Sequence, residues 1–142
     1  MKGLTSTLDL VRPGNYDDLE GLGMLVEILP HSVPWSSIGH MSEMLGVSTS
    51  ELFAVIGMAE RTALRRQKEG YLKPDEADRL LRVGRVFEEA SRVLGSEAKA
   101  ARWLGTPSVA LFQSKPLSLL DSDAGTQAVT EELTRIDFGD FA

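Results

Sequence analysis

From Ser36 onward this chain is a succession of helix-length apolar stretches, and most of these stretches stop at a glycine. Within each stretch, apolar residues recur at three- and four-residue spacing, which is the period of an α-helix with one buried face. Glycine readily takes the left-handed conformation that ends a helix, and it follows four of the stretches, at Gly46, Gly57, Gly70 and Gly95. The pattern predicts an all-α protein of short helices.

The starts of the predicted helices carry capping residues. Serine and aspartate accept hydrogen bonds from the free N–H groups of a first helical turn, and proline fits its first position. The predicted starts are Ser36 or Ser37, Ser48, Ala59, Pro74, Ser96, Pro116 and residues 121–123. We therefore expect a helical domain at residues 36–95 and a second one at 96–142, while the poorly patterned residues 1–35 form an arm of uncertain order that packs on the first domain.

Several functional classes are excluded by what the chain lacks. It has no cysteine, so it can form neither a disulfide nor a thiolate metal site. No apolar run approaches the roughly 18 residues that a membrane helix needs, and the first residues lack the apolar segment of a secretion signal. We expect a cytoplasmic protein with no membrane contact.

Residues suited to catalysis or metal binding are also missing from the pattern. His31 and His40 are the only histidines, and they are too far apart for a helix-borne metal pair. The adjacent carboxylates, such as Glu88 and Glu89, point about 100° apart on a helix and form no shared site. The sequence predicts no enzyme, no metal and no cofactor.

One short segment is basic, although the net charge of the chain is −6. Residues 61–73 carry five basic side chains and one acidic side chain. A local basic stretch can bind phosphates while an acidic body limits non-specific adhesion, although charge runs are also common on solvated helix faces. Nucleic-acid binding is therefore compatible with the composition.

The basic stretch belongs to a pattern typical of a helix-turn-helix motif. Gly57 tolerates the positive φ of a tight turn, and Ile56 and Met58 supply apolar residues that seal it. The following helix would place its N-terminal half in the major groove of DNA. There, Arg61, Thr62 and Arg65 could face the bases together, whereas Arg66 and Lys68 are better placed for backbone phosphates.

Two observations keep this interpretation open. Phe53 falls at a position where the motif usually carries a small residue, because its two helices approach closely there. Either the neighbouring Ala54 compensates by a small rotation or the motif is distorted. An ordinary helical hairpin would also show much of this pattern, so the residues alone do not decide for DNA.

The last segment of the chain combines aromatic and acidic residues. Phe138 and Phe141 lie beyond the last apolar residue of the final predicted helix, interleaved with Asp137 and Asp140. Such a tail could enter a basic cavity of a partner protein or fold back onto its own domain. Trp103, a lone aromatic on a short predicted helix, is most often a core residue.

Taken together, these segments resemble the Xre/MbcA/ParS antitoxins, the partners of RES-domain toxins, over roughly residues 36–142. The residues that carry the resemblance are Thr62–Arg66, Glu69-Gly70-Tyr71-Leu72, Asp75–Leu80, Ala100-Ala101-Arg102-Trp103-Leu104, Thr106-Pro107, Pro116-Leu117-Ser118-Leu119-Leu120, Gly125, Val129 and Leu133–Gly139. The combination is fairly specific, although no single piece would be. The family commonly has a glycine pair and a threonine where this chain has Phe112-Gln113-Ser114-Lys115, so the turn there is expected to differ in shape.

The resemblance implies an antitoxin that represses its own operon and binds a toxin through its C-terminal domain. RES toxins resemble ADP-ribosyl transferases and deplete NAD⁺. The resemblance further implies that the segment from Trp103 and Leu104 onward contacts the toxin and that the tail blocks the active-site entrance of the toxin. The tail residues are Arg135, Asp137, Phe138, Gly139, Asp140, Phe141 and Ala142. Because a pocket for an anionic dinucleotide should be electropositive, the acidic tail suits it.

The expected assembly is a homodimer within a larger toxin–antitoxin complex. A dimer is expected on operator DNA because one recognition helix reads too few base pairs for useful specificity. The rival interpretation is a stand-alone transcriptional regulator whose C-terminal part only dimerises or senses a ligand. A third interpretation is a scaffold protein whose helix-turn-helix does not bind DNA.

Overall fold

The computed structural model describes residues 33–139, and this part of the chain is helical throughout. Its elements are α3 (Ser36–Leu45), α4 (Thr49–Ile56), α5 (Glu60–Glu69), α6 (Pro74–Leu94), α7 (Glu97–Leu104), the 3₁₀ turns η2 (Val109–Leu111) and η3 (Pro116–Asp121), and α8 (Asp123–Asp137). Residues 33–139 contain no strand, only two isolated bridges, Pro34 to Tyr71 and Ser108 to Ser114. The predicted all-α fold is confirmed.

Most helix ends follow the capping chemistry expected from the sequence, but the predicted cap at Ser36 or Ser37 is wrong, because α3 begins after Trp35 and no side chain caps its start. Gly46, Gly57, Gly70 and Gly95 all have positive φ and end the four helices that precede them. The side chains of Ser48, Ser96 and Ser122 accept a hydrogen bond from the third residue beyond them and so cap α4, α7 and α8. Only η2 was not expected from the sequence.

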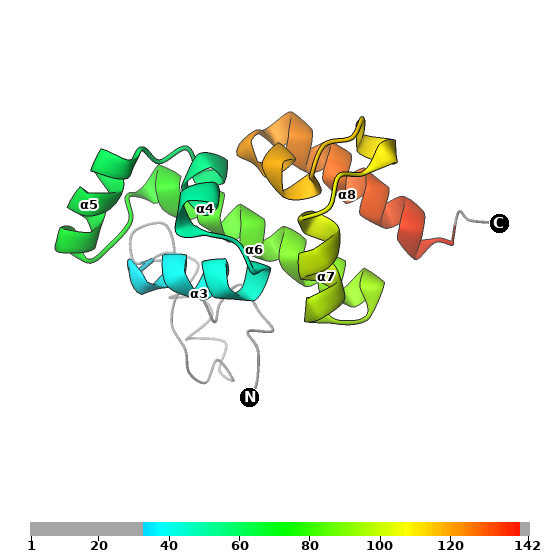
Figure 1. The fold of residues 1–142 in the computed structure, drawn as a ribbon, viewed down its shortest axis with the longest axis horizontal. Helices are drawn as coiled ribbons and strands as arrows, with labels where there is room; N and C mark the ends of the chain where they lie inside the picture. Colours follow the sequence, from blue (N-terminus) through cyan, green and yellow to red (C-terminus); the bar gives the residue numbers. More distant parts are fainter. Residues whose placement is uncertain (1–32, 140–142) are drawn as a thin grey trace, which may run out of the picture.

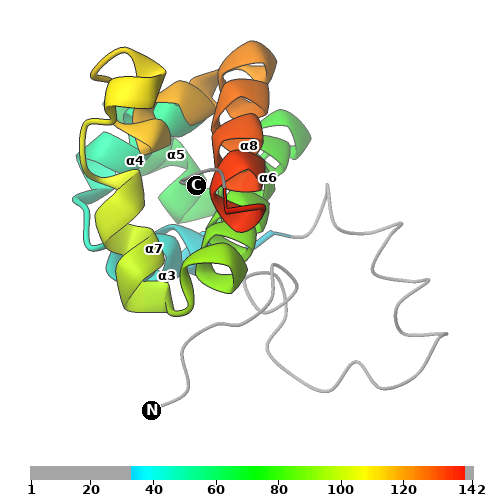
Figure 2. The ribbon, with the colours of Figure 1, turned by 90° about the vertical axis from the view of Figure 1, so that its right-hand side faces the viewer.

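Helix α6 is the structural centre of the molecule (Figure 1). It packs against α4 in the first half of the chain and against α7, η3 and α8 in the second half. In the view along the long dimension (Figure 2), α8 lies beside α6. Helices α3 and α7 lie on the opposite side of the molecule from this pair (Figure 2). Figure 1 shows α5 at one end of this long dimension and the end of α8 at the other.

The buried apolar side chains form one continuous core that both halves share. Its largest fully buried members are Phe87, Ile38, Met41, Leu52, Ile56, Leu80, Leu104, Leu117, Leu120, Leu133, Val33 and Val83. The predicted boundary between residues 95 and 96 falls just after α6, and the core passes across it. The division into domains stays a prediction.

Of the predicted N-terminal arm, only residues 33–35 lie within the described part of the chain. Val33 is fully buried. The Trp35 N–H donates to the Gly70 carbonyl, and the Leu72 N–H donates to the Val33 carbonyl, each at 2.9 Å. These bonds join the chain before α3 to the chain between α5 and α6. The packing expected for residues 1–32 concerns residues outside the described range.

Phe53 fits into the fold without distorting the turn that follows α4. Its side chain is buried, and its ring centroid lies 6.0 Å from that of Trp35. The bulk of the ring is thus accommodated against the segment that precedes α3. The Met58 N–H still donates to the Phe53 carbonyl at 2.9 Å, so the corner keeps its regular geometry.

Gly125 allows the first turn of α8 to lie directly on η3. A Cβ atom added at Gly125 would stand 2.0 Å from the Leu119 carbonyl oxygen, which is a backbone atom. The Gly125 N–H also donates to the Ser122 hydroxyl at 3.0 Å. The same Cβ would also stand 3.0 Å from the Ser122 hydroxyl oxygen, so glycine is required here for close approach.

We predict that Gly125→Ala lowers the free energy of unfolding by about 3 kcal/mol, because two pieces of backbone must move apart. Gly39→Ala is the matched control: Gly39 is an exposed residue inside α3, and an added Cβ there meets nothing within 4 Å. It should raise stability by up to about 1 kcal/mol, since alanine favours the helix. Urea unfolding followed by circular dichroism measures both, and equal effects would contradict the packing argument.

Candidate functional site

Helices α4 and α5 form a helix-turn-helix corner. Gly57 has φ 68° and ends α4, while Ile56 and Met58 are buried on either side of it, as the sequence predicts. The Arg79 guanidinium donates to the Ile56 carbonyl at 3.4 Å, and the Ser50 hydroxyl donates to the Glu60 carboxylate at 3.0 Å. These two bonds hold the end of α4 to α6 and the start of α4 to the start of α5.

The outer face of α5 is basic. Arg61, Leu64, Arg65 and Lys68 line a shallow hollow of about 460 Å³, and their spacing of three and four residues puts them on one side of the helix. Among the carboxylates of residues 33–139, none forms an ion pair with these three cations. Thr62 is half-buried at the edge of this face. The α5 face, defined by these four hollow-lining residues, is free for an anionic partner.

Leu64 is a residue of this face that the sequence pattern did not single out. Ala63 is buried, whereas Leu64 is 65% exposed, because neighbouring residues on a helix point in directions about 100° apart. Leu64 lies three residues after Arg61 and four before Lys68, and this spacing could have placed it on the α5 face.

Arg66 does not lie on the α5 face, which corrects the expectation that it meets phosphates. It is 6% exposed. Its Nε donates to Glu76 at 2.8 Å and its Nη1 donates to Glu69 at 3.1 Å. The bond to Glu76 raises the pKa of the Arg66 guanidinium above its ordinary value. Glu76 also accepts the Lys73 N–H at 2.9 Å, so this carboxylate joins α5 to the first turn of α6.

In the C-terminal half, Trp103 and Leu104 have different surroundings. Leu104 is fully buried, so it supports the core and cannot itself touch a partner, which corrects its expected role in binding. Trp103 is half-buried and packs against the same core from the outside. Only the exposed part of Trp103 remains available for a contact.

The end of α8 is held by two ion pairs. Arg135 pairs with Glu132 one turn earlier in the helix. Asp137 accepts from Arg92 of α6 at 2.9 Å, and Arg92 also binds Glu89. The bond from Arg92 lowers the pKa of Glu89. The carboxylate of Asp137 therefore has a positioning role in the free protein.

Beyond these pairs the chain leaves the helix. Phe138 is 79% exposed, and Gly139 has φ 70°. The remaining predicted contact residues, Asp140, Phe141 and Ala142, lie outside the described range. The Arg92–Asp137 ion pair joins the last turn of α8 to α6.

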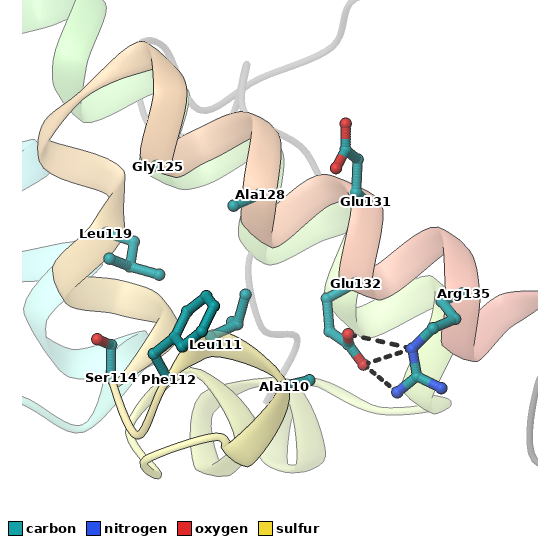
Figure 3. A pocket seen from close by; sticks show the side chains of 10 residues that line it. All are labelled: Ala110, Leu111, Phe112, Ser114, Leu119, Gly125, Ala128, Glu131, Glu132 and Arg135. Atoms are coloured by element: carbon teal, nitrogen blue, oxygen red, sulfur yellow. Dashed lines mark hydrogen bonds and ion pairs between the residues drawn. The ribbon is translucent and has the colours of Figure 1, made fainter.

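A groove that the sequence analysis missed lies beside α8. It has a volume of about 460 Å³, and Figure 3 shows the side chains around it. Its lining comprises Ala110, Leu111, Phe112, Ser114, Leu119, Gly125, Ala128, Glu131, Glu132 and Arg135. The departure from the family pattern at Phe112 and Gln113 was the available signal. Both have positive φ, 55° and 65°, and they are the only non-glycine residues among 33–139 to do so.

No cluster of three or more histidine, cysteine, aspartate or glutamate side chains could hold a metal ion anywhere in residues 33–139. Within that range no helix has the length and apolarity to span a membrane. His31 lies outside the described range, and His40 is exposed.

Two family models match the chain, one after the other. Residues 24–85 match the antitoxin Xre-like helix-turn-helix domain, and residues 89–139 match the antitoxin Xre/MbcA/ParS C-terminal toxin-binding domain. The chain belongs to the Xre/MbcA/ParS antitoxin family. The first match begins at residue 24, within the predicted N-terminal arm, and the boundary between the two matches falls inside α6.

Three curated relatives of this chain are each named antitoxin Xre. The antitoxin Xre of Yersinia enterocolitica is 28% identical over 123 residues, which cover 85% of this chain and 77% of that protein. The antitoxin Xre of Photorhabdus laumondii is 29% identical over 119 residues, covering 82% and 74%. The antitoxin Xre of Pseudomonas putida is 35% identical over 72 residues, covering 51% and 45%. The protein is thus an antitoxin of a toxin–antitoxin system, with a helix-turn-helix domain and a toxin-binding domain.

The buried ion pair of this antitoxin gives a stability prediction. Arg66→Ala should lower the free energy of unfolding by about 3 kcal/mol, because it leaves the Glu76 carboxylate buried without its cation. Arg65→Ala, one residue away on the exposed face, should change it by less than about 0.5 kcal/mol. Urea denaturation compares the two variants. Equal losses would show that the Arg66–Glu76 pair is no stronger than a surface contact.

Proposed function

We propose that this antitoxin neutralises a RES-domain toxin that degrades NAD⁺ and represses its own operon by binding operator DNA as a homodimer. The observation that carries the proposal is the match of residues 89–139 to a toxin-binding domain directly after a helix-turn-helix domain. The identity of the toxin class rests on the family resemblance. A stand-alone regulator would not require the toxin-binding domain.

The tail is the part of the chain proposed to block the toxin. A RES toxin binds an anionic dinucleotide, so its active-site entrance should be electropositive. Asp140 and the aromatic residues Phe138 and Phe141 suit such an entrance. Asp137 is already bound to Arg92, so its proposed task is to aim the tail. Trp103 and Arg135 would contact the toxin around the entrance.

The α5 face is proposed to bind the operator. Arg61 and Arg65 would reach base edges, with guanine as the preferred partner of arginine, and Lys68 would bind a phosphate. The half-buried Thr62 would reach a base or the sugar-phosphate backbone. Two copies would place two α5 helices in successive major grooves.

The two proposed surfaces are compatible with simultaneous binding. The α5 face and the end of α8 lie at opposite ends of the molecule (Figure 1). A toxin held at one end would therefore leave the other free for DNA. In this proposal the protein acts in the cytoplasm, where operon and NAD⁺ are both present.

The tail is tested with an antitoxin that ends at Gly139, which keeps all of α8 and the Arg92–Asp137 pair. Intracellular NAD⁺ is measured when the toxin is expressed with the full-length or the shortened antitoxin. We expect full protection by the first and loss of NAD⁺ with the second. Matching melting temperatures of the two antitoxins control for folding.

Two results would contradict this part of the proposal. Equal protection by both antitoxins would move neutralisation to the folded surface. Unchanged NAD⁺ when the toxin is expressed alone would refute an NAD⁺-degrading toxin.

The α5 face is tested with Arg61→Ala and Arg65→Ala on the DNA upstream of the operon. Each should weaken binding by about 1–3 kcal/mol, since each removes a base contact. Lys68→Ala should weaken binding to all sequences and lower its salt dependence by about one counterion. Lys99→Ala, on the exposed side of α7, is the charge-matched control. Fluorescence anisotropy measures the affinities, and a double Arg61, Arg65 variant that binds normally would refute this face.

A further inference from the structure

The turn between η2 and η3 holds two bulky residues in an unfavourable backbone conformation. Phe112 has φ 55° and ψ 43°, and Gln113 has φ 65°. Left-handed conformations are disfavoured for residues with a Cβ, and two in succession are rare. The turn is closed by hydrogen bonds from the Gln113 N–H to the Ser108 carbonyl, at 2.8 Å, and from the Ser108 N–H to the Ser114 carbonyl, at 3.0 Å.

The side chain of Phe112 contributes almost nothing to the folding of the isolated protein. It is 95% exposed, the highest value among the large apolar residues of the described chain. The next residue back, Leu111, is 7% exposed and anchors the turn in the core. The local geometry therefore presents a phenylalanine ring to the outside, and strained backbone of this kind is characteristic of binding sites.

The Phe112 ring lies among the residues that line the groove beside α8 (Figure 3). Leu119 and Ala128 continue the apolar lining from Phe112. Within the same lining, Glu132 is balanced by Arg135. Glu131 accepts a hydrogen bond from Gln127 at 3.1 Å, and no cation of residues 33–139 pairs with it. The groove is thus apolar around Phe112, and Glu131 adds a negative charge at its rim, with its carboxylate pointing away from the ring (Figure 3).

We propose that Phe112 and this groove are an anchor for the cognate toxin, separate from the tail. An apolar side chain of the toxin lies against Phe112 and Leu119, and a lysine or arginine of the toxin pairs with Glu131. This inference rests on the proposed function. The toxin is the chosen occupant because the groove lies within the residues matched to the toxin-binding domain and α8 leads from it directly to the tail.

The backbone strain makes a selective test possible. Phe112→Gly removes the ring but suits a positive φ, so the folded protein should be as stable as before or more stable. Its affinity for the purified toxin should fall at least about tenfold, as for an aromatic hot spot. Gln113→Gly gives the same backbone relief without loss of the ring, and its affinity should be unchanged. Calorimetric titration of full-length variants measures the affinities, and thermal melting measures stability.

The negative charge of Glu131 is tested with a separate substitution. Glu131→Lys should weaken toxin binding, and the weakening should diminish as salt is raised, because the repulsion is screened. Thr130→Lys adds a cation at the adjacent exposed position, and it should have a smaller effect.

The possible results separate this inference from the proposed function. If the wild-type antitoxin binds the toxin and Phe112→Gly binds it equally well, the anchor is refuted while the toxin pairing stands. If Phe112→Gly instead turns a dimeric antitoxin into a monomer with unchanged toxin affinity, the groove binds a second copy and the anchor is refuted. If the wild-type antitoxin does not bind the toxin at all, the proposed function fails and the anchor with it.

Discussion

The fold depends on the need to cover α6. Its buried residues extend from Glu76 to Ala90 and lie on more than one side of the helix, so no single neighbouring helix can keep water from them. Helix α4 covers part of this surface, and α7, η3 and α8 cover the rest. Because both halves of the chain pack on one helix of about 30 Å, the spacing between the α5 face and the end of α8 is fixed by a rigid element.

The basic side chains also fall into two groups, one that binds within the fold and one that faces solvent. The α5 face holds cations that have no acidic partner within the described chain, whereas two arginines that are mostly buried form ion pairs within the fold. Arg66 binds Glu76, and Arg82 binds both Asp123 and the Leu120 carbonyl. These two arginines connect helices, whereas the cations of the α5 face make no such connection. An acidic protein can in this way keep one basic surface directed at a polyanion.

Much of the helical architecture could be predicted from the sequence because helix ends depend on local chemistry. A serine at the first position and a glycine at the last have the same effect in almost any surroundings. The position of Arg66 could not be predicted, since its partner Glu76 is ten residues away on another helix. Leu104 looked like a surface candidate for the same reason: its burial depends on neighbours that are distant in sequence. The turn at Phe112 was harder still, because it violates the local preference on which such predictions rely.

The burial of Arg66 also bears on how the recognition helix can evolve. Positions 63 and 66 are committed to packing and to the ion pair with α6, so a change there alters the stability of the whole protein. Positions 61, 64, 65 and 68 touch nothing that the fold requires. Mutations at these four positions can therefore accumulate at little structural cost, and under the proposed function they would change which operator the antitoxin binds. Helix α5 thus separates the residues that maintain the fold from those that can diverge without disturbing it.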